Sequence, residues 1–139
     1  MPRILRISVV DPDPDYLGIE IYAASERYAG STRIYTSEDE LSEFGRVIEG
    51  FPSAASDTRN YVLGTEEDGF AGGYIEFRFY CTDGAGHAAI GIRMTDDMNR
   101  NYTEASASFS FAVTPAEIDT FVAGLMRVAA ARSGCVELE

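Results

Sequence analysis

The stretch YIEFRFYCTDGAGHAAIGIRM, residues 74–94, determines the fold that this sequence predicts. Apolar residues occupy every second position of residues 75–81 and again of residues 88–94. This alternation indicates two strands, each with one apolar and one polar face. The glycine-rich turn at residues 83–86 joins them, and such a turn is typical of a β-hairpin.

The same alternation continues in a third strand over residues 105–113. We expect the apolar sides of the three strands to form one wall of the core. The residues expected to be buried there are Phe77, Phe79, Ile90, Ile92, Phe109 and Phe111. Alternating or β-branched runs predict further strands at residues 4–10, 17–22, 30–36, 60–64 and 135–138.

Two helices separate these groups of strands. Ser37 followed by Glu40 is a capping box, and it predicts a helix that ends near Gly50. Thr114 and Glu117 form a second capping box, followed by an apolar stripe at helical spacing. The sequence shows no internal repeat and no linker that would divide it. It predicts a single domain over residues 1–139, of class α+β, with a curved, mainly antiparallel sheet and two helices packed on one face in two layers.

Composition excludes several kinds of chemistry. The chain has no lysine and one histidine, His87, so it lacks a P-loop lysine, a Schiff-base lysine and a two-histidine metal motif. The net charge of −12 argues against nucleic acid or an anionic membrane surface as a partner and favours a basic protein. Two cysteines and the absence of an apolar leader or span predict a cytoplasmic protein with reduced thiols and no cofactor.

Three motifs resemble ligand sites but are better explained as turns. Residues 84–89, GAGHAA, match a degenerate dinucleotide fingerprint, yet a strand follows them where the fingerprint needs a helix. Cys81, Asp83 and His87 lack a fourth metal ligand at a defined spacing. The aspartates of residues 11–15 lack the glycine and glutamate of a calcium loop. We therefore predict no catalytic, cofactor or metal residues.

The remaining constellation is a set of tyrosine, arginine and glutamate side chains on the outward sides of the predicted strands. Tyrosine and arginine are common among the residues that dominate binding at protein interfaces. The alternative is an ordinary solvated sheet face with cross-strand pairs. The candidate interaction face comprises Glu20, Tyr22, Tyr35, Glu76, Arg78, Tyr80 and Arg93.

The segment FYCTDGAGHA, residues 79–88, with the following strand and the helix from Ala116, resembles a family of small uncharacterised bacterial proteins. This resemblance carries no catalytic motif. In size, acidity and α+β pattern the chain is also similar to immunity proteins that neutralise bacterial toxins. That second likeness implies a non-enzymatic binding role, but it does not identify any site residues in this chain.

The sequence thus favours a non-catalytic protein-binding domain, either an immunity-like inhibitor or a homodimeric accessory protein. The alternative is a small-molecule-binding module or a carboxylate-using enzyme with a cleft beside the acidic loops, such as residues 66–68. A flat tyrosine- and arginine-bearing face would favour the first function, and a deep polar pocket would favour the second.

Overall fold

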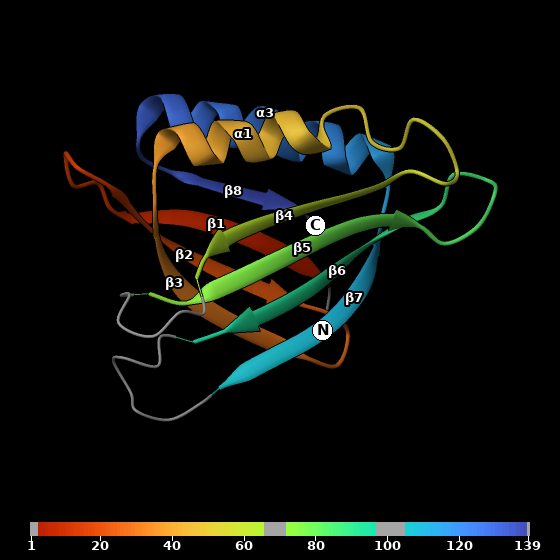
Figure 1. Ribbon diagram of the computed structural model, residues 1–139, viewed down its shortest axis with the longest axis horizontal. Helices are drawn as coiled ribbons and strands as arrows, with labels where there is room; N and C mark the ends of the chain where they lie inside the picture. The colour runs from red at the N-terminus through yellow and green to blue at the C-terminus, as the bar shows by residue number, and fades with distance from the viewer. Residues whose placement is uncertain (1–2, 66–71, 97–104, 139) are drawn as a thin grey trace.

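The computed structural model describes residues 3–65, 72–96 and 105–138 of an α+β protein (Figure 1). It contains two antiparallel sheets of four strands each. Sheet A has the order β3-β2-β1-β8, with β1 at Ile4–Asp11, β2 at Leu17–Ala24, β3 at Ala29–Thr36 and β8 at Cys135–Leu138. Sheet B has the order β4-β5-β6-β7, with β4 at Thr58–Gly64, β5 at Tyr74–Cys81, β6 at Ala88–Thr95 and β7 at Ser106–Val113. The predicted class is confirmed, and the strands are divided between two sheets.

Helices α1 (Glu38–Ile48) and α3 (Pro115–Ala131) lie side by side above β8 and β4 (Figure 1). The Ser37 side chain accepts a hydrogen bond from the backbone N–H of Glu40 and starts α1. Thr114 starts α3 in the same way, and the Glu117 side chain returns a bond to the Thr114 N–H. Both helices therefore start at the predicted cap residue, directly after the third strand of a meander, and among the described contacts the full capping box is present at α3 alone.

Within the described residues, the same order of five elements occurs twice. The first unit is β1-β2-β3-α1-β4 and the second is β5-β6-β7-α3-β8. Strand registers agree between the units, since Ala24 pairs with Ala29 as Thr95 pairs with Ser106. The last strand of each unit joins the sheet of the other: β4 pairs with β5, and β8 pairs with β1. The two units therefore exchange their final strands, which ties the first residues of the chain to the last.

The helices α1 and α3 also carry the same residues at some equivalent positions. Counting from the caps Ser37 and Thr114, both helices carry glutamate at the third position and phenylalanine at the seventh. These phenylalanines, Phe44 and Phe121, meet between the helices with ring centroids 6.1 Å apart. Phe44 also stacks on Phe77 of sheet B at 4.7 Å. One continuous core thus joins both units.

The core includes the inner faces of both sheets and the facing sides of both helices. Of the six aromatic and aliphatic residues expected to be buried, all but Phe109 are buried. Phe109 is half-buried, because β7 is an edge strand and this part of it borders open space.

Candidate functional site

The seven residues of the predicted interaction face do not form one surface. Glu20, Tyr22 and Tyr35 belong to sheet A, whereas Glu76, Arg78, Tyr80 and Arg93 belong to sheet B. All seven lie outside the core, as alternation predicts. Because the inner faces of the two sheets share a single core, their outer faces point to different sides of the molecule. The predicted residues therefore form two smaller faces, one on each sheet.

On the outer side of sheet A, charged and aromatic side chains pair with one another. Arg33 pairs with Glu20 at 3.6 Å. Arg6 lies 5.6 Å from the centroid of the Tyr22 ring and also pairs with Glu137 at 3.2 Å. Such exposed pairs are typical of a solvated sheet face, and each contributes little to stability.

On sheet B, arginines lie over tyrosine rings. The guanidinium of Arg78 is 5.0 Å from the centroid of the Tyr80 ring. That of Arg93 is 5.1 Å from the Tyr74 ring and 3.4 Å from a carboxylate oxygen of Glu76. Burial and the hydrogen bond to Glu76 raise the pKa of Tyr74. Within the described part of the chain, the guanidinium of Arg78 has no carboxylate partner.

Small residues form the floor beside these pairs. Across the sheet, Arg78 lies opposite Gly91, and Gly91 lies opposite Ser110. The neighbouring row places Arg93 opposite Ser108. The resulting depression holds only about 180 Å³. We call the surface formed by Tyr74, Glu76, Arg78, Tyr80, Gly91, Arg93, Ser108 and Ser110 the outer face of sheet B.

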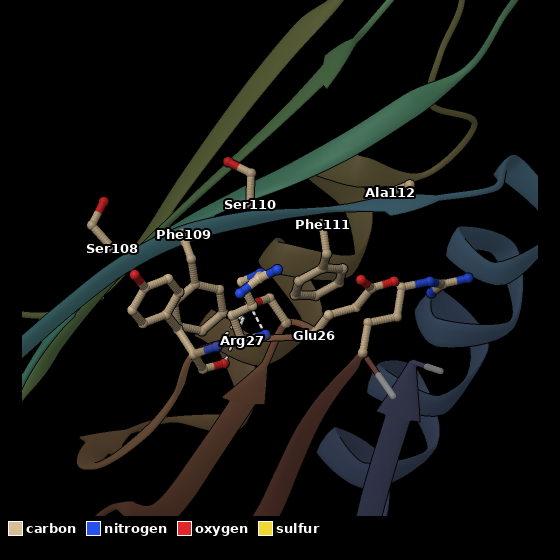
Figure 2. Close-up of a pocket in the computed structure, with 10 residues that line it drawn as sticks. Glu26, Arg27, Ser108, Phe109, Ser110, Phe111 and Ala112 are labelled. Atoms are coloured by element: carbon tan, nitrogen blue, oxygen red, sulfur yellow. Dashed lines mark hydrogen bonds between the residues drawn. The ribbon is translucent and has the colours of Figure 1, made fainter. Parts of the chain in front are cut away.

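A larger hollow lies between β7 and the turn that joins β2 to β3 (Figure 2). Its volume is about 550 Å³. Phe109 and Phe111 of β7 form one wall, and residues 25–28 of the turn form the other. Arg3, next to β1, completes the lining. The predicted strands at residues 17–22 and 30–36 leave room for this turn, but no local sequence pattern shows that the edge strand β7 lies opposite it.

This cleft differs from the one that the sequence suggested. The expected cleft lay beside the acidic loops, and residues 66–68 are outside the described residues. The cleft beside β7 is lined mainly by apolar surface and has a single carboxylate, Glu26. Acid–base catalysis by a carboxylate pair needs two such groups at one bond, so this lining does not support the carboxylate-enzyme alternative.

The predicted hairpin with its turn at residues 83–86 is confirmed, because Cys81 pairs with Ala88 at the ends of the two strands. His87 Nδ1 lies 2.5 Å from an Asp83 oxygen on this exposed turn. The hydrogen bond from His87 is the main cause that lowers the pKa of Asp83. Cys81 is half-buried and its Sγ donates to the Ala54 carbonyl at 3.7 Å. Residues 3–65, 72–96 and 105–138 contain no group of three or more His, Cys, Asp or Glu side chains placed to hold a metal ion.

No protein-family model, curated protein or solved structure matches the chain. None of the described helices is both long and apolar enough to cross a membrane. The candidate sites are therefore evaluated on their own geometry.

Proposed function

We propose that this chain is a non-catalytic protein-binding domain whose partner docks on the outer face of sheet B. An immunity-like inhibitor and a homodimeric accessory protein are the two forms that this role can take. The observation that carries the proposal is the Arg78–Tyr80 pair, which stands beside the low floor at Gly91.

The composition of this face suits an interface. Arginine and tyrosine supply large contact areas and charged donors, and they dominate many interfaces energetically. Here the cation–aromatic contact already places the Arg78 side chain over Tyr80, so binding needs to immobilise less of it. Both residues project from β5, a central strand of sheet B, which makes the platform rigid.

The shape of the face favours a macromolecule over a small ligand. A small molecule needs a concave site that covers most of its surface, usually with a volume above roughly 300 Å³. The depression around Gly91 holds about 180 Å³ and is open. A protein surface can cover it together with the two arginine–tyrosine pairs.

Net charge suggests what kind of protein the partner is. At −12, the chain attracts a basic protein over a distance of about one Debye length, which is about 8 Å at physiological ionic strength. Helix α1 contributes Glu38, Asp39, Glu40 and Glu43 to this field, although Arg132 pairs with Glu38 at 3.1 Å. Such charges act chiefly on the association rate. With this charge and these cysteines, we place the domain in the cytoplasm, without nucleic-acid or membrane partners.

The chain offers a matched control for testing this face. The Arg78→Ala, Tyr80→Ala double variant removes the pair on sheet B, and the Arg6→Ala, Tyr22→Ala double variant removes an equivalent pair on sheet A. Each folded variant and the wild type serve as bait in lysate of the native host, with quantitative mass spectrometry. The proposal predicts a partner whose recovery falls with the first variant alone, and whose dissociation constant rises about 30-fold or more.

A partner lost equally from both variants, or from neither, would contradict the proposed face. Sedimentation of the purified protein separates the two forms of the role. Self-association that the first variant abolishes identifies the homodimer, whereas a monomer with a heterologous partner identifies the inhibitor.

A further inference from the structure

The two units contact each other differently at their two junctions. At the first junction, β3 crosses the end of sheet B. The backbone N–H of Gly73 donates to the carbonyl of Arg33 at 2.7 Å, and Thr32 Oγ1 donates to the carbonyl of Thr95 at 2.8 Å. This approach requires glycine, because a Cβ at Gly73 would lie 1.9 Å from Thr32 Oγ1. The first junction is therefore closed by backbone contact.

Strand registers identify the equivalent residues at the second junction. Ile4 pairs with Ala24 as Tyr74 pairs with Thr95, so Arg3 occupies the place of Gly73. Ile21 pairs with Thr32 as Ile92 pairs with Phe109, so Phe109 replaces Thr32. An arginine and a phenylalanine thus stand where a glycine and a threonine allow close contact.

The second junction is consequently open. Among the described residues no backbone hydrogen bond joins Arg3 to Ser110, the counterpart of Arg33. The space left is the hollow of about 550 Å³ beside β7, which we call the β7 cleft. The cleft thus lies at the junction where an arginine and a phenylalanine stand in place of the glycine and threonine of the first junction.

The lining of the β7 cleft combines aromatic surface with arginine donors. Phe109, Phe111 and Tyr28 supply the aromatic surface. In Figure 2 the Arg27 side chain lies between Phe109 and Phe111. Its guanidinium has no ion pair or hydrogen bond to another described residue.

Arg3 adds a second donor at the edge of the cleft. Its Nη2 donates to both carboxylate oxygens of Glu117, at 2.9 and 2.7 Å. Its Nη1 is buried and has no hydrogen-bond partner among the described residues. An acceptor in the cleft could pair with Nη1 only after the Arg3 side chain turned toward it, and that bond would recover the free energy that an unpaired buried donor costs.

The charges of the lining select the ligand. Arg3 already pairs with Glu117, so Arg27 is the cation of the lining that has no carboxylate partner among the described residues. One negative charge on the ligand would pair with Arg27, whereas a dianion would meet more repulsion from a chain with net charge −12. Aromatic walls require an apolar body, and a volume within roughly 300–1,000 Å³ is that of small-molecule sites.

We propose that the β7 cleft binds a small monoanionic carboxylate with an apolar body, which Arg27 holds by its guanidinium between Phe109 and Phe111. Planar carboxylates suit guanidinium donors, which engage both oxygens together. The cleft and the outer face of sheet B share Ser108 and Ser110 of β7, but this inference does not rest on the partner face, because Arg27 and Phe111 line the cleft and not that face.

The test uses 4-phenylbutyrate as the probe and two analogues with the same body, 4-phenylbutanol and 4-phenylbutylammonium. Binding to the whole chain is measured by ¹H–¹⁵N NMR titration. We expect 4-phenylbutyrate to bind with its largest shifts at residues 26–28 and 108–112. The alcohol should bind about tenfold or more weakly, and the ammonium should bind more weakly still.

Variants test the role of Arg27. Arg27→Gln should weaken 4-phenylbutyrate binding about tenfold or more and leave 4-phenylbutanol binding unchanged. Arg33→Gln removes an equal charge from β3 and should change neither. The Arg78→Ala, Tyr80→Ala variant should bind the probe like the wild type, which separates this result from that of the partner face.

The proposal would be overturned by equal affinity for the alcohol and the carboxylate, by unchanged carboxylate binding in Arg27→Gln, or by no saturable shift of the cleft residues at millimolar probe. Shifts confined to the floor around Gly91 would also overturn it, because they would place the ligand on the outer face of sheet B.

Discussion

Asp57 illustrates how a single residue can connect two elements. Its carboxylate accepts hydrogen bonds from Arg59 Nη2 at 2.8 Å and from the Ser53 backbone N–H at 2.9 Å. Arg59 in turn donates to the carbonyls of Glu49 and Val47 at the end of α1, at 2.6 and 3.3 Å. The pair therefore fixes the start of β4 to the C-terminus of α1.

Lowering the pH should remove the contribution of the Asp57–Arg59 pair to the free energy of unfolding. The hydrogen bond from Arg59, followed by that from Ser53, lowers the pKa of Asp57 from 3.8 to about 2. Because the folded pKa is the lower one, the stabilisation is complete above the unfolded pKa of 3.8 and is lost as the pH falls through about 2. We expect Asp57→Asn to lower the free energy of unfolding at pH 7, and the difference from wild type to vanish near pH 2.

Urea unfolding at several pH values measures this difference. Asp15→Asn is the control, because its carboxylate makes no ion pair in the part of the chain that the structure describes. A deficit in Asp57→Asn that is equally large at pH 2 and pH 7 would show that the ionised pair is not its cause.

The sequence reveals little of this residue-level detail. It predicts a strand that begins at residue 60, whereas β4 spans Thr58–Gly64. The error has a physical cause: Arg59 is ordered by carbonyls of α1, and the pattern around it carries no sign of them. The outward-facing residues were easier to predict, because strand alternation alone places Arg78 and Tyr80 on the same side of β5, outside the core.

At the scale of elements, the close approach of β3 to sheet B depends on Gly73. A Cβ there would lie 1.9 Å from Thr32 Oγ1 and 2.5 Å from the Thr95 carbonyl oxygen, so the backbone must move to accommodate it. We expect Gly73→Ala to lower the free energy of unfolding by about 1–3 kcal/mol, the usual cost of overpacking.

Gly84 provides the comparison for this variant. A Cβ at Gly84, in the turn between β5 and β6, meets nothing within 4 Å. Gly84→Ala should therefore change stability by less than about 0.5 kcal/mol. Similar effects of both substitutions in urea unfolding would contradict the closed junction at β3.

The sequence predicted the individual strands and helices better than it predicted which strands pair with one another. Alternation identified the strands of the meander, and the capping boxes identified the starts of both helices. The pairing of β8 with β1 joins residues more than a hundred positions apart, and no local signal specifies it. For the same reason the expectation of one curved sheet did not reveal the division into sheets A and B, since a strand's apolar face does not identify its neighbour.

At the scale of the whole molecule, the exchange of final strands places the two ends of the chain together. Leu138 lies opposite Leu5 in sheet A, as Leu63 lies opposite Ile75 in sheet B. The sequence hides this duplication because few equivalent positions carry the same residue. Phe44 and Phe121 are identical, but Thr32 corresponds to Phe109 and Gly73 to Arg3. The β7 cleft arises at the last two of these differences, and so sequence patterns could not predict it.

A circular permutant tests the duplication. Nine residues, 65–73, connect β4 to β5. A linker of about six residues from Glu139 to Met1, followed by residues 1–3, would reproduce that connection between β8 and β1. With new ends in the turn between Ala85 and Gly86, we expect a folded protein with one cooperative transition and an unchanged urea m-value.

The same permutation opened between Gly91 and Ile92 is the control, because it cuts the central strand β6. That protein should not fold cooperatively. If the permutant opened in the turn also fails to fold, the ends of β8 and β1 do not have the relation that the register describes.

The first junction between the units is closed and the second is open, and this difference leaves the β7 cleft for a ligand. Scalar couplings across hydrogen bonds, measured by NMR on the uniformly labelled protein, test this difference. We expect a coupling between the ¹⁵N of Gly73 and the carbonyl ¹³C of Arg33, and none between the ¹⁵N of Arg3 and the carbonyl ¹³C of Ser110. A coupling between Arg3 and Ser110 would contradict it, because the second junction would then be closed like the first.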